Sequence, residues 1–140
     1  MDTAALCALA TAQLRAAAVP ADAGPMAAYM KTDMPCFGVK KPARAPIERA
    51  LIQGFPPPNR DAWEAGIRAL WALTHREEKY LALAWGRRFC KLATPESLPL
   101  YAFLVRDGAW WDLVDDVAAH LVGGLWRRFP VPVAAAMDRW

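Results

Sequence analysis

The sequence predicts an all-α domain, and three observations support this fold class. Apolar residues recur three and four positions apart through almost the whole chain, which is the spacing of one helix face. No segment shows the sustained alternation of polar and apolar residues that a strand needs. Short stretches rich in Pro and Gly separate the periodic segments, as connections between helices do. At 140 residues the chain is long enough for one core, so residues 1–140 are predicted to form a single domain.

Composition limits the classes of protein that fit. With 56% apolar and 22% charged residues, the chain has the composition of neither a disordered nor a membrane protein. The first residues lack the pattern of a signal peptide and no long apolar run follows, so we expect neither a signal peptide nor a membrane span. A net charge of +3 allows an anionic partner such as nucleic acid without requiring one. The three cysteines form no CxxC or Cys/His cluster, so we expect no metal, reduced thiols and a cytoplasmic protein.

Two helices are predicted before the first long break. Asp2 can cap a helix that runs to about residue 18, before Val19-Pro20. A shorter helix is predicted over 22–32, and its spacing directs three residues inward: Met26, Tyr29 and Met30. Core packing is the plain interpretation of Tyr29.

The segment 33–42 is predicted to be a loop, because it is rich in Pro and Gly and has no period. Lys40 and Lys41 lie in this loop, flanked by Lys31 and Arg44. Four cations beside free backbone N–H groups suit a phosphate ligand. The alternative is a solvated basic turn.

The third and fourth helices flank a run of three prolines. The third is predicted over 45–55, with Pro46 in its first turn, where the missing N–H costs least. Asn59 or Asp61 can cap the fourth. Its inward residues follow the spacing i, i+4, i+7, i+8 that is typical of helix packing: Trp63, Ile67, Leu70 and Trp71.

The fifth and sixth helices follow short breaks. The fifth is predicted over 74–92, with His75 as a surface or capping residue rather than a ligand. Its last turns carry three cations that suit a helix C-terminus and could extend a nucleic-acid surface: Arg87, Arg88 and Lys91. The sixth helix is predicted to begin with Thr94 as its N-cap and Pro95 at its first helical position.

The stretch 110–116 is the main site candidate. If one helix spans 111–127, Asp115 shares a stripe with Trp111 and Trp126 beside the core face. We expect this carboxylate to be partly buried against indole rings at the mouth of a cationic groove. The alternative is that the aspartates of this stretch are helix-start acids, each worth roughly 0.3–1 kcal/mol beside the exposed N–H groups.

About eight helices are predicted, the last of which opens at Pro130. The pairs that begin near Asn59 and Pro95 lie about 36 residues apart, which is short for HEAT repeats of roughly 40–47 residues. Short connections and antiparallel pairs nevertheless favour stacked helix pairs over a closed bundle. The predicted architecture is a HEAT-like solenoid of stacked antiparallel helix pairs.

Three stretches spread over nearly the whole chain carry a resemblance to a known family. They are Tyr29-Met30-Lys31 followed by Phe37-Gly38-Val39, then Arg76-Glu77-Glu78-Lys79-Tyr80, and Trp110-Trp111-Asp112-Leu113-Val114-Asp115. In order and spacing they resemble the bacterial DNA alkylation repair enzymes of the HEAT-like glycosylase family. The resemblance implies a solenoid whose concave, basic face holds duplex DNA. It also implies hydrolysis of the N-glycosidic bond of N3- or N7-alkylated purines, without a metal or cofactor.

The resemblance also implies roles for individual residues. The family's catalytic aspartate corresponds to Asp115, its sugar-contacting tryptophan to Trp111, and a further aromatic of the pocket to Tyr29. The remaining positions are expected on the DNA-binding surface: Lys31, Lys40, Lys41, Trp110, Arg87 and Arg88.

The implied chemistry suits these residue types. An alkylated purine already carries positive charge, so it leaves readily and positive character builds on the deoxyribose. At about 4 Å and an effective dielectric near 20, a carboxylate facing that cation contributes about 4 kcal/mol, or on the order of 10³ in rate. Asp115 would also orient the attacking water. The faces of Trp111 and Tyr29 would attract the cationic lesion or sugar.

Members of this family continue past the end of this sequence, with helix pairs that add a pocket tryptophan and arginines. The residues 137–140 resemble the beginning of the next segment, so we expect an apparently truncated solenoid with Trp140 at an apolar edge that favours self-association. Two other functions fit the helical pattern. One is a non-catalytic helical-repeat module that binds DNA or protein, and the other is a protein-interaction scaffold without DNA affinity.

Overall fold

A computed structural model describes residues 1–108 and 111–140, apart from the side chain of Trp111. All regular structure in these residues is helical, which confirms the predicted all-α class. The longer helices are α1 (Thr3–Ala17), α2 (Pro20–Met30), α3 (Lys41–Gly54), α4 (Arg60–Trp71), α5 (Arg76–Arg88), α6 (Leu98–Gly108) and α9 (Pro130–Met137). Between α6 and α9 the chain forms α7 (Trp111–Asp116), the π-helical segment η3 (Val117–Val122) and α8 (Gly123–Arg128). Two short 3₁₀ turns, η1 (Cys90–Leu92) and η2 (Pro95–Ser97), connect α5 to α6.

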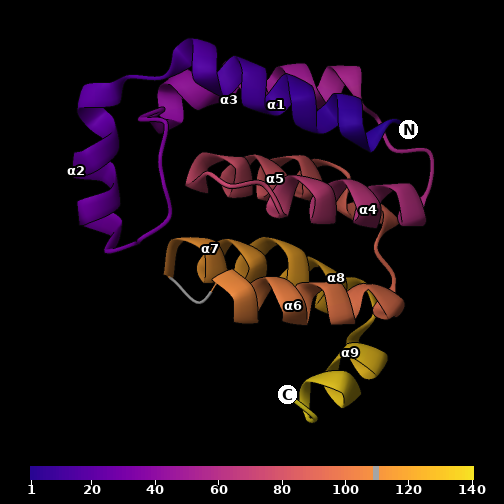
Figure 1. Ribbon diagram of the computed structural model, residues 1–140. Coiled ribbons are helices and arrows are strands. Elements are labelled where there is room, and N and C mark those ends of the chain that lie inside the picture. Colours follow the sequence, from indigo (N-terminus) through magenta and orange to yellow (C-terminus); the bar gives the residue numbers. More distant parts are fainter. Residues whose placement is uncertain (109–110) are drawn as a thin grey trace.

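The helices are stacked in two layers (Figure 1). One layer contains α1, α4 and α6, and the other contains α3, α5 and the continuous run from α7 to α8. Across the layers α1 packs on α3, α4 on α5, and α6 on α7 and η3. Within each pair the two helices run in opposite directions, so the fold is the predicted stack of antiparallel helix pairs.

The core lies between the two layers and confirms the helical spacing predicted for α4. All four of its predicted inward residues are buried: Trp63, Ile67, Leu70 and Trp71. The Trp63 Nε1 donates to the Gly86 carbonyl at 3.0 Å, so this buried polar group is satisfied. Asn59 caps α4, since its side-chain oxygen accepts from the Ala62 N–H at 2.8 Å.

α2 stands across the end of the stack (Figure 1), and it makes no extensive contact with another helix. None of its residues is buried, and Tyr29 is 75% exposed. The prediction that Tyr29 points into the core is therefore wrong, because no second helix covers that face. The helix begins at Pro20 rather than after Asp22, since proline is well tolerated in a first turn.

Two further predictions differ from the structure. α3 begins at Lys41, four residues before the predicted start, so that Pro42 rather than Pro46 occupies its first turn. The predicted helix 111–127 is interrupted by η3. A π-helix bonds residue i to i+5, so an extra residue enters the turn and the side chains beyond it are rotated relative to those of α7.

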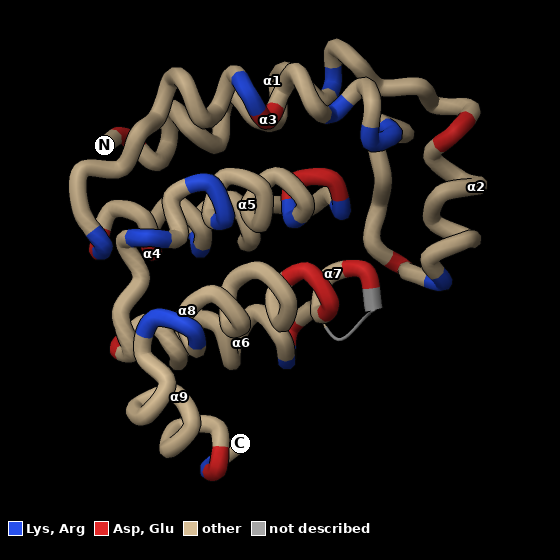
Figure 2. The backbone as a smooth tube through the Cα atoms, turned by 180° about the vertical axis from the view of Figure 1, so that it is seen from behind, with Lys and Arg blue, Asp and Glu red and all other residues tan. Residues whose placement is uncertain are grey.

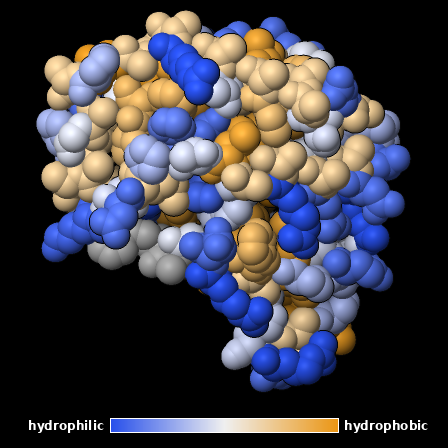
Figure 3. All heavy atoms as spheres, in the orientation of Figure 1, coloured by the Kyte–Doolittle hydropathy of each residue, from blue (hydrophilic) through white to orange (hydrophobic). Residues whose placement is uncertain are grey.

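The solvent face of α1 is lined by small side chains. Four exposed alanines follow one another at intervals of four residues: Ala4, Ala8, Ala12 and Ala16. The upper part of the face in Figure 3 is accordingly dominated by weakly hydrophobic atoms. Within the described residues no single helix has the length and apolarity to cross a membrane. The pair α1 and α2, bent by 109°, meets that test by length and composition alone.

Candidate functional site

A cleft of about 940 Å³ opens between α2, α3, α5 and the α7–η3 run. Figure 2 shows the molecule from the side of α3, α5 and α8, with acidic positions on α7 and basic positions on α5 and α8. Among the described residues, five cations line the cleft: Lys40, Lys41, Arg44, Arg87 and Arg88. Three carboxylates also line it: Glu48, Asp112 and Asp116. The excess of positive charge favours an anionic ligand.

A buried carboxylate anchors the loop that leads into α3. Glu77 has no solvent exposure, and it accepts from three consecutive backbone N–H groups. The oxygen–nitrogen distances are 3.0 Å to Phe37, 2.9 Å to Gly38 and 3.0 Å to Val39. Charge-assisted bonds to N–H groups are about twice as strong as neutral ones. Glu77 therefore fixes the loop whose next residues are Lys40 and Lys41.

Gly38 is required for this loop conformation. Its φ is +85°, a region that residues with a Cβ rarely adopt. A Cβ at this position would lie 2.1 Å from the Val19 carbonyl oxygen. The loop thus turns tightly against the first turn of α2 while presenting three N–H groups to Glu77.

A second buried network joins α5 to α7. Arg76 donates through Nη2 to the Asp112 carboxylate at 2.6 Å and through Nε to the Tyr80 hydroxyl at 3.1 Å. The Tyr80 hydroxyl in turn donates to the other oxygen of Asp112. Burial, reinforced by this hydrogen bond to Asp112, raises the pKa of Tyr80 to about 12. The phenol therefore stays a donor at neutral pH.

The two other charged residues of this turn face away from the cleft. Glu78 accepts from the His75 N–H at 2.8 Å and from the Thr11 hydroxyl of α1. His75 and Glu78 form a capping box, which confirms His75 as a capping residue. The Lys79 ammonium donates to the Trp71 carbonyl at 2.7 Å.

Sequence reasoning missed the burial of residues 76–79. A run of charges at a helix start is normally solvated, and these four are 7% exposed or less. All four were identified only as part of a resemblance, without a role in the site. The signal in the sequence is the length of the run: four successive charges cover every face of a helix, so some must point inward.

The structure does not bury the predicted catalytic carboxylate. Asp115 is exposed, and it is not among the described residues that line the cleft. The expectation that it packs partly buried on a shared stripe with Trp126 is wrong, because Asp115 is exposed on α7 and Trp126, which follows the change of register at η3, is 43% exposed. Trp111 begins α7, but only its backbone is described, and Trp110 lies outside the described residues.

The predicted DNA-binding residues fall into three groups. The cleft brings together Lys40, Lys41, Arg87 and Arg88. Tyr29 instead lines an adjoining cavity of about 240 Å³, together with Arg76 and Tyr80. Lys31 caps the C-terminus of α2 in a left-handed conformation with φ of 50°, and it is exposed outside both hollows.

Metal-binding residues do not cluster in the part of the chain that the structure describes. No group of three or more His, Cys, Asp or Glu side chains there is arranged to hold a metal ion. The acidic side chains of the cleft are instead engaged with cations, as Asp112 is with Arg76 and Glu48 is with Arg44 at 3.8 Å.

The protein-family model described as "DNA alkylation repair enzyme" matches residues 10–140. The match therefore includes the cleft, the Glu77-anchored loop and all helices from the middle of α1 to α9. A search of curated proteins found no significant match.

Proposed function

Because the chain belongs to the DNA alkylation repair enzyme family, we propose that it hydrolyses the N-glycosidic bond of N3- or N7-alkylated purines in duplex DNA. The family supports DNA repair as the general function. The observation that carries the proposal is the cationic cleft, which lies on the layer of α3 and α5 and is lined from both helices. A hydrolytic reaction of this kind needs a carboxylate, a water molecule and a bound duplex.

The cleft offers the charge that a duplex requires. Double-stranded DNA carries one negative charge per about 1.7 Å of helix axis, so several cations in a row match its phosphates. Lys40 and Lys41 lie at the start of α3, whereas Arg87 and Arg88 lie at the end of α5. The two pairs would contact phosphates at separate positions along the cleft.

Asp115 is the carboxylate that we propose for catalysis, together with Trp111. It lies on α7, the same helix as the cleft-lining residues Asp112 and Asp116. Its side chain is exposed beside the part of α7 that lines the cleft. Its attraction to the developing sugar cation would grow as the bound duplex excludes water and lowers the effective dielectric.

The test is a base-release assay on methylated duplex DNA. We expect the protein to release 3-methyladenine or 7-methylguanine, and Asp115→Asn to abolish release while DNA binding stays within about twofold of the native value. Asp61→Asn is the matched control, since the Asp61 side chain is 93% exposed on α4 in the other layer. Excision by Asp115→Asn at the native rate would refute the role of Asp115.

A second candidate function is a non-catalytic module that binds DNA or protein. The observation that favours it is that Asp115 is exposed, while Asp112, which does line the cleft, is neutralised by Arg76. This alternative predicts salt-sensitive DNA binding without base release. The same assay distinguishes the two functions, because only a glycosylase leaves free purine and abasic DNA.

We also propose self-association through exposed apolar side chains near α9. Val131 is 78% exposed and Trp140 is 46% exposed. Contiguous exposed apolar surface favours association. Sedimentation of the native protein and of Val131→Ser would test this, since a monomeric native protein would contradict it.

A further inference from the structure

The first turn of α5 lies between the two walls of the cleft. On one side stand the loop 37–39 and the lysines that follow it, and on the other stands α7. Two adjacent residues of this turn each reach one wall. Glu77 bonds to the loop, and Arg76 bonds to Asp112 at the start of α7.

On the lysine side, the loop is held mainly through its backbone groups. Glu77 accepts from the N–H groups of Phe37, Gly38 and Val39, and the Arg76 N–H donates to the Pro35 carbonyl at 3.0 Å. Without the carboxylate, three buried N–H groups would lack their acceptor. The loop would then be free to relax, and Lys40 and Lys41 would move with it.

The contact on the acid side consists of side chains. Asp112 is held at both oxygens, by Arg76 and by Tyr80. Arg44 of α3 stacks 4.5 Å from the centre of the Tyr80 ring, so this phenol also contacts the helix of the lysine wall. Since Asp112 lies in the first turn of α7, this network sets the position of the helix that carries Asp115.

We propose that Glu77 and Arg76 are positioning residues, each of which holds mainly one wall of the cleft. Glu77 governs affinity for DNA through the lysine loop, and Arg76 governs the rate of base release through Asp112 and α7. The role of Glu77 requires only that the cleft binds DNA. The role of Arg76 rests on the proposed glycosylase function.

Burial supports an indirect role for both residues. Glu77 has no solvent exposure and Arg76 is 3% exposed, so a duplex in the cleft would meet the loop and α7 rather than these side chains. Replacing Glu77 should therefore change mainly the affinity for DNA, and disturbing the contact of Arg76 should change mainly the rate of base release. A purely structural role would instead affect both properties together.

The experiment compares three variants of matched chemistry: Glu77→Gln, Asp112→Asn and Glu78→Gln. Glu78 is a control because it is a buried carboxylate of the same turn whose partners, His75 and Thr11, lie away from the cleft. Each variant is measured for its Kd on unmodified duplex DNA, for single-turnover base release, and for amide hydrogen exchange.

We expect Glu77→Gln to raise Kd about tenfold and to leave the single-turnover rate at saturating DNA within about twofold. Asp112→Asn should lower that rate about tenfold without weakening binding. Amide hydrogen exchange should rise at residues 37–39 in Glu77→Gln and in α7 in Asp112→Asn. Glu78→Gln should change neither Kd nor rate.

Equal effects of all three variants on Kd and rate would overturn the proposal, as would exchange that rises uniformly across the chain. If the native protein releases no base, the glycosylase proposal fails, while the Kd and exchange measurements still decide whether each wall has its own anchor. Should Glu77→Gln not fold, Glu77→Asp keeps the charge but is one methylene too short to reach all three N–H groups. Arg76→Lys likewise keeps the charge but loses the planar fork that contacts Asp112 and Tyr80.

Discussion

The Arg76 guanidinium and the Asp112 carboxylate join α5 to α7 at a nitrogen–oxygen distance of 2.6 Å. Only 4% and 8% of these side chains are exposed, so the pair is shielded from water and from salt. Each partner also bonds to the Tyr80 hydroxyl. The pair is therefore part of a closed triangle of side chains, in which the loss of either charged member leaves the other charge buried without its counter-ion.

Replacing one member of the pair should destabilise the protein strongly. We expect Asp112→Ala to lower the free energy of unfolding by about 3–5 kcal/mol, because it leaves the Arg76 charge buried and unpaired. Asp112→Asn retains an acceptor and should cost only about 1–3 kcal/mol. Urea unfolding of both variants, of Arg76→Ala and of the double alanine variant measures these losses and the coupling between the residues. Additive losses for the two alanine variants would contradict the coupling.

Gly38 should not tolerate a side chain. Gly38→Ala places a Cβ 2.1 Å from the Val19 carbonyl oxygen at a φ of +85°, so we expect a loss of at least about 1–3 kcal/mol. Gly24→Ala is the matched control, since no atom lies within 4 Å of its Cβ position and Gly24 is inside α2. That variant should be neutral or stabilise by up to about 1 kcal/mol. Thermal unfolding of both variants measures the difference, and similar Tm values would refute the strain at Gly38.

The raised pKa of Tyr80 predicts a loss of stability in alkali. The group keeps its proton up to about pH 12 in the folded state but loses it near pH 10.0 when unfolded. The folded state therefore binds the proton more tightly than the unfolded state does. The resulting contribution to the free energy of unfolding is complete below pH 10 and is lost as pH rises towards 12. Unfolding midpoints measured across this interval should fall less steeply in Tyr80→Phe than in the native protein. Parallel curves would contradict the assignment.

Much of the fold could be predicted because its information is local. The spacing of Trp63, Ile67, Leu70 and Trp71 defines the buried face of α4, and the cap at Asn59 marks where that helix begins. Both signals lie within one segment of sequence. The stack of antiparallel pairs then follows from short connections between such helices.

The candidate site was predicted less well because its contacts join distant segments. Glu77 bonds to residues about 40 positions earlier in the chain, and Arg76 bonds to Asp112, 36 positions later. No local pattern shows that a charged residue at a helix start has such partners. The π-helical segment η3 also has no signature in the sequence, and it changes the helical register between Asp115 and Trp126, which were expected on one stripe. Whether Asp115 acts in catalysis stays a prediction.

The number of cations that contact DNA should be visible in the salt dependence of binding. Each phosphate contact contributes about 0.9 to the slope of log K against log salt, so Arg87→Gln/Arg88→Gln should lower that slope by about 2. Arg88 stacks 5.5 Å from the centre of the Phe89 ring, which holds its guanidinium on the surface at the end of α5. The double variant Lys40→Gln/Lys41→Gln should reduce the slope by a similar amount.

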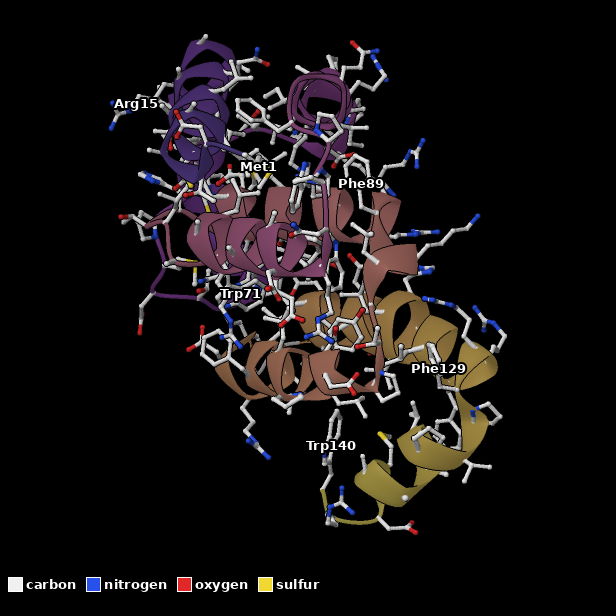
Figure 4. All side chains as sticks on the ribbon, turned by 90° about the vertical axis from the view of Figure 1, so that its right-hand side faces the viewer. Met1, Arg15, Trp71, Phe89, Phe129 and Trp140 are labelled. Carbon is white, nitrogen blue, oxygen red and sulfur yellow. The ribbon has the colours of Figure 1, made fainter. Side chains whose placement is uncertain are left out.

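Arg15→Gln is the control for this measurement. Figure 4 shows Arg15 projecting from α1 on the side of the molecule opposite to Phe129, away from the ends of α5 and α8. It carries the same charge as the cleft arginines, so an effect of net charge alone would appear in this variant as well. We expect its slope to match that of the native protein. Equal reductions per charge in Arg15→Gln and in the cleft variants would mean that DNA responds to the overall charge of the protein, and that the cleft is not the surface on which the duplex lies.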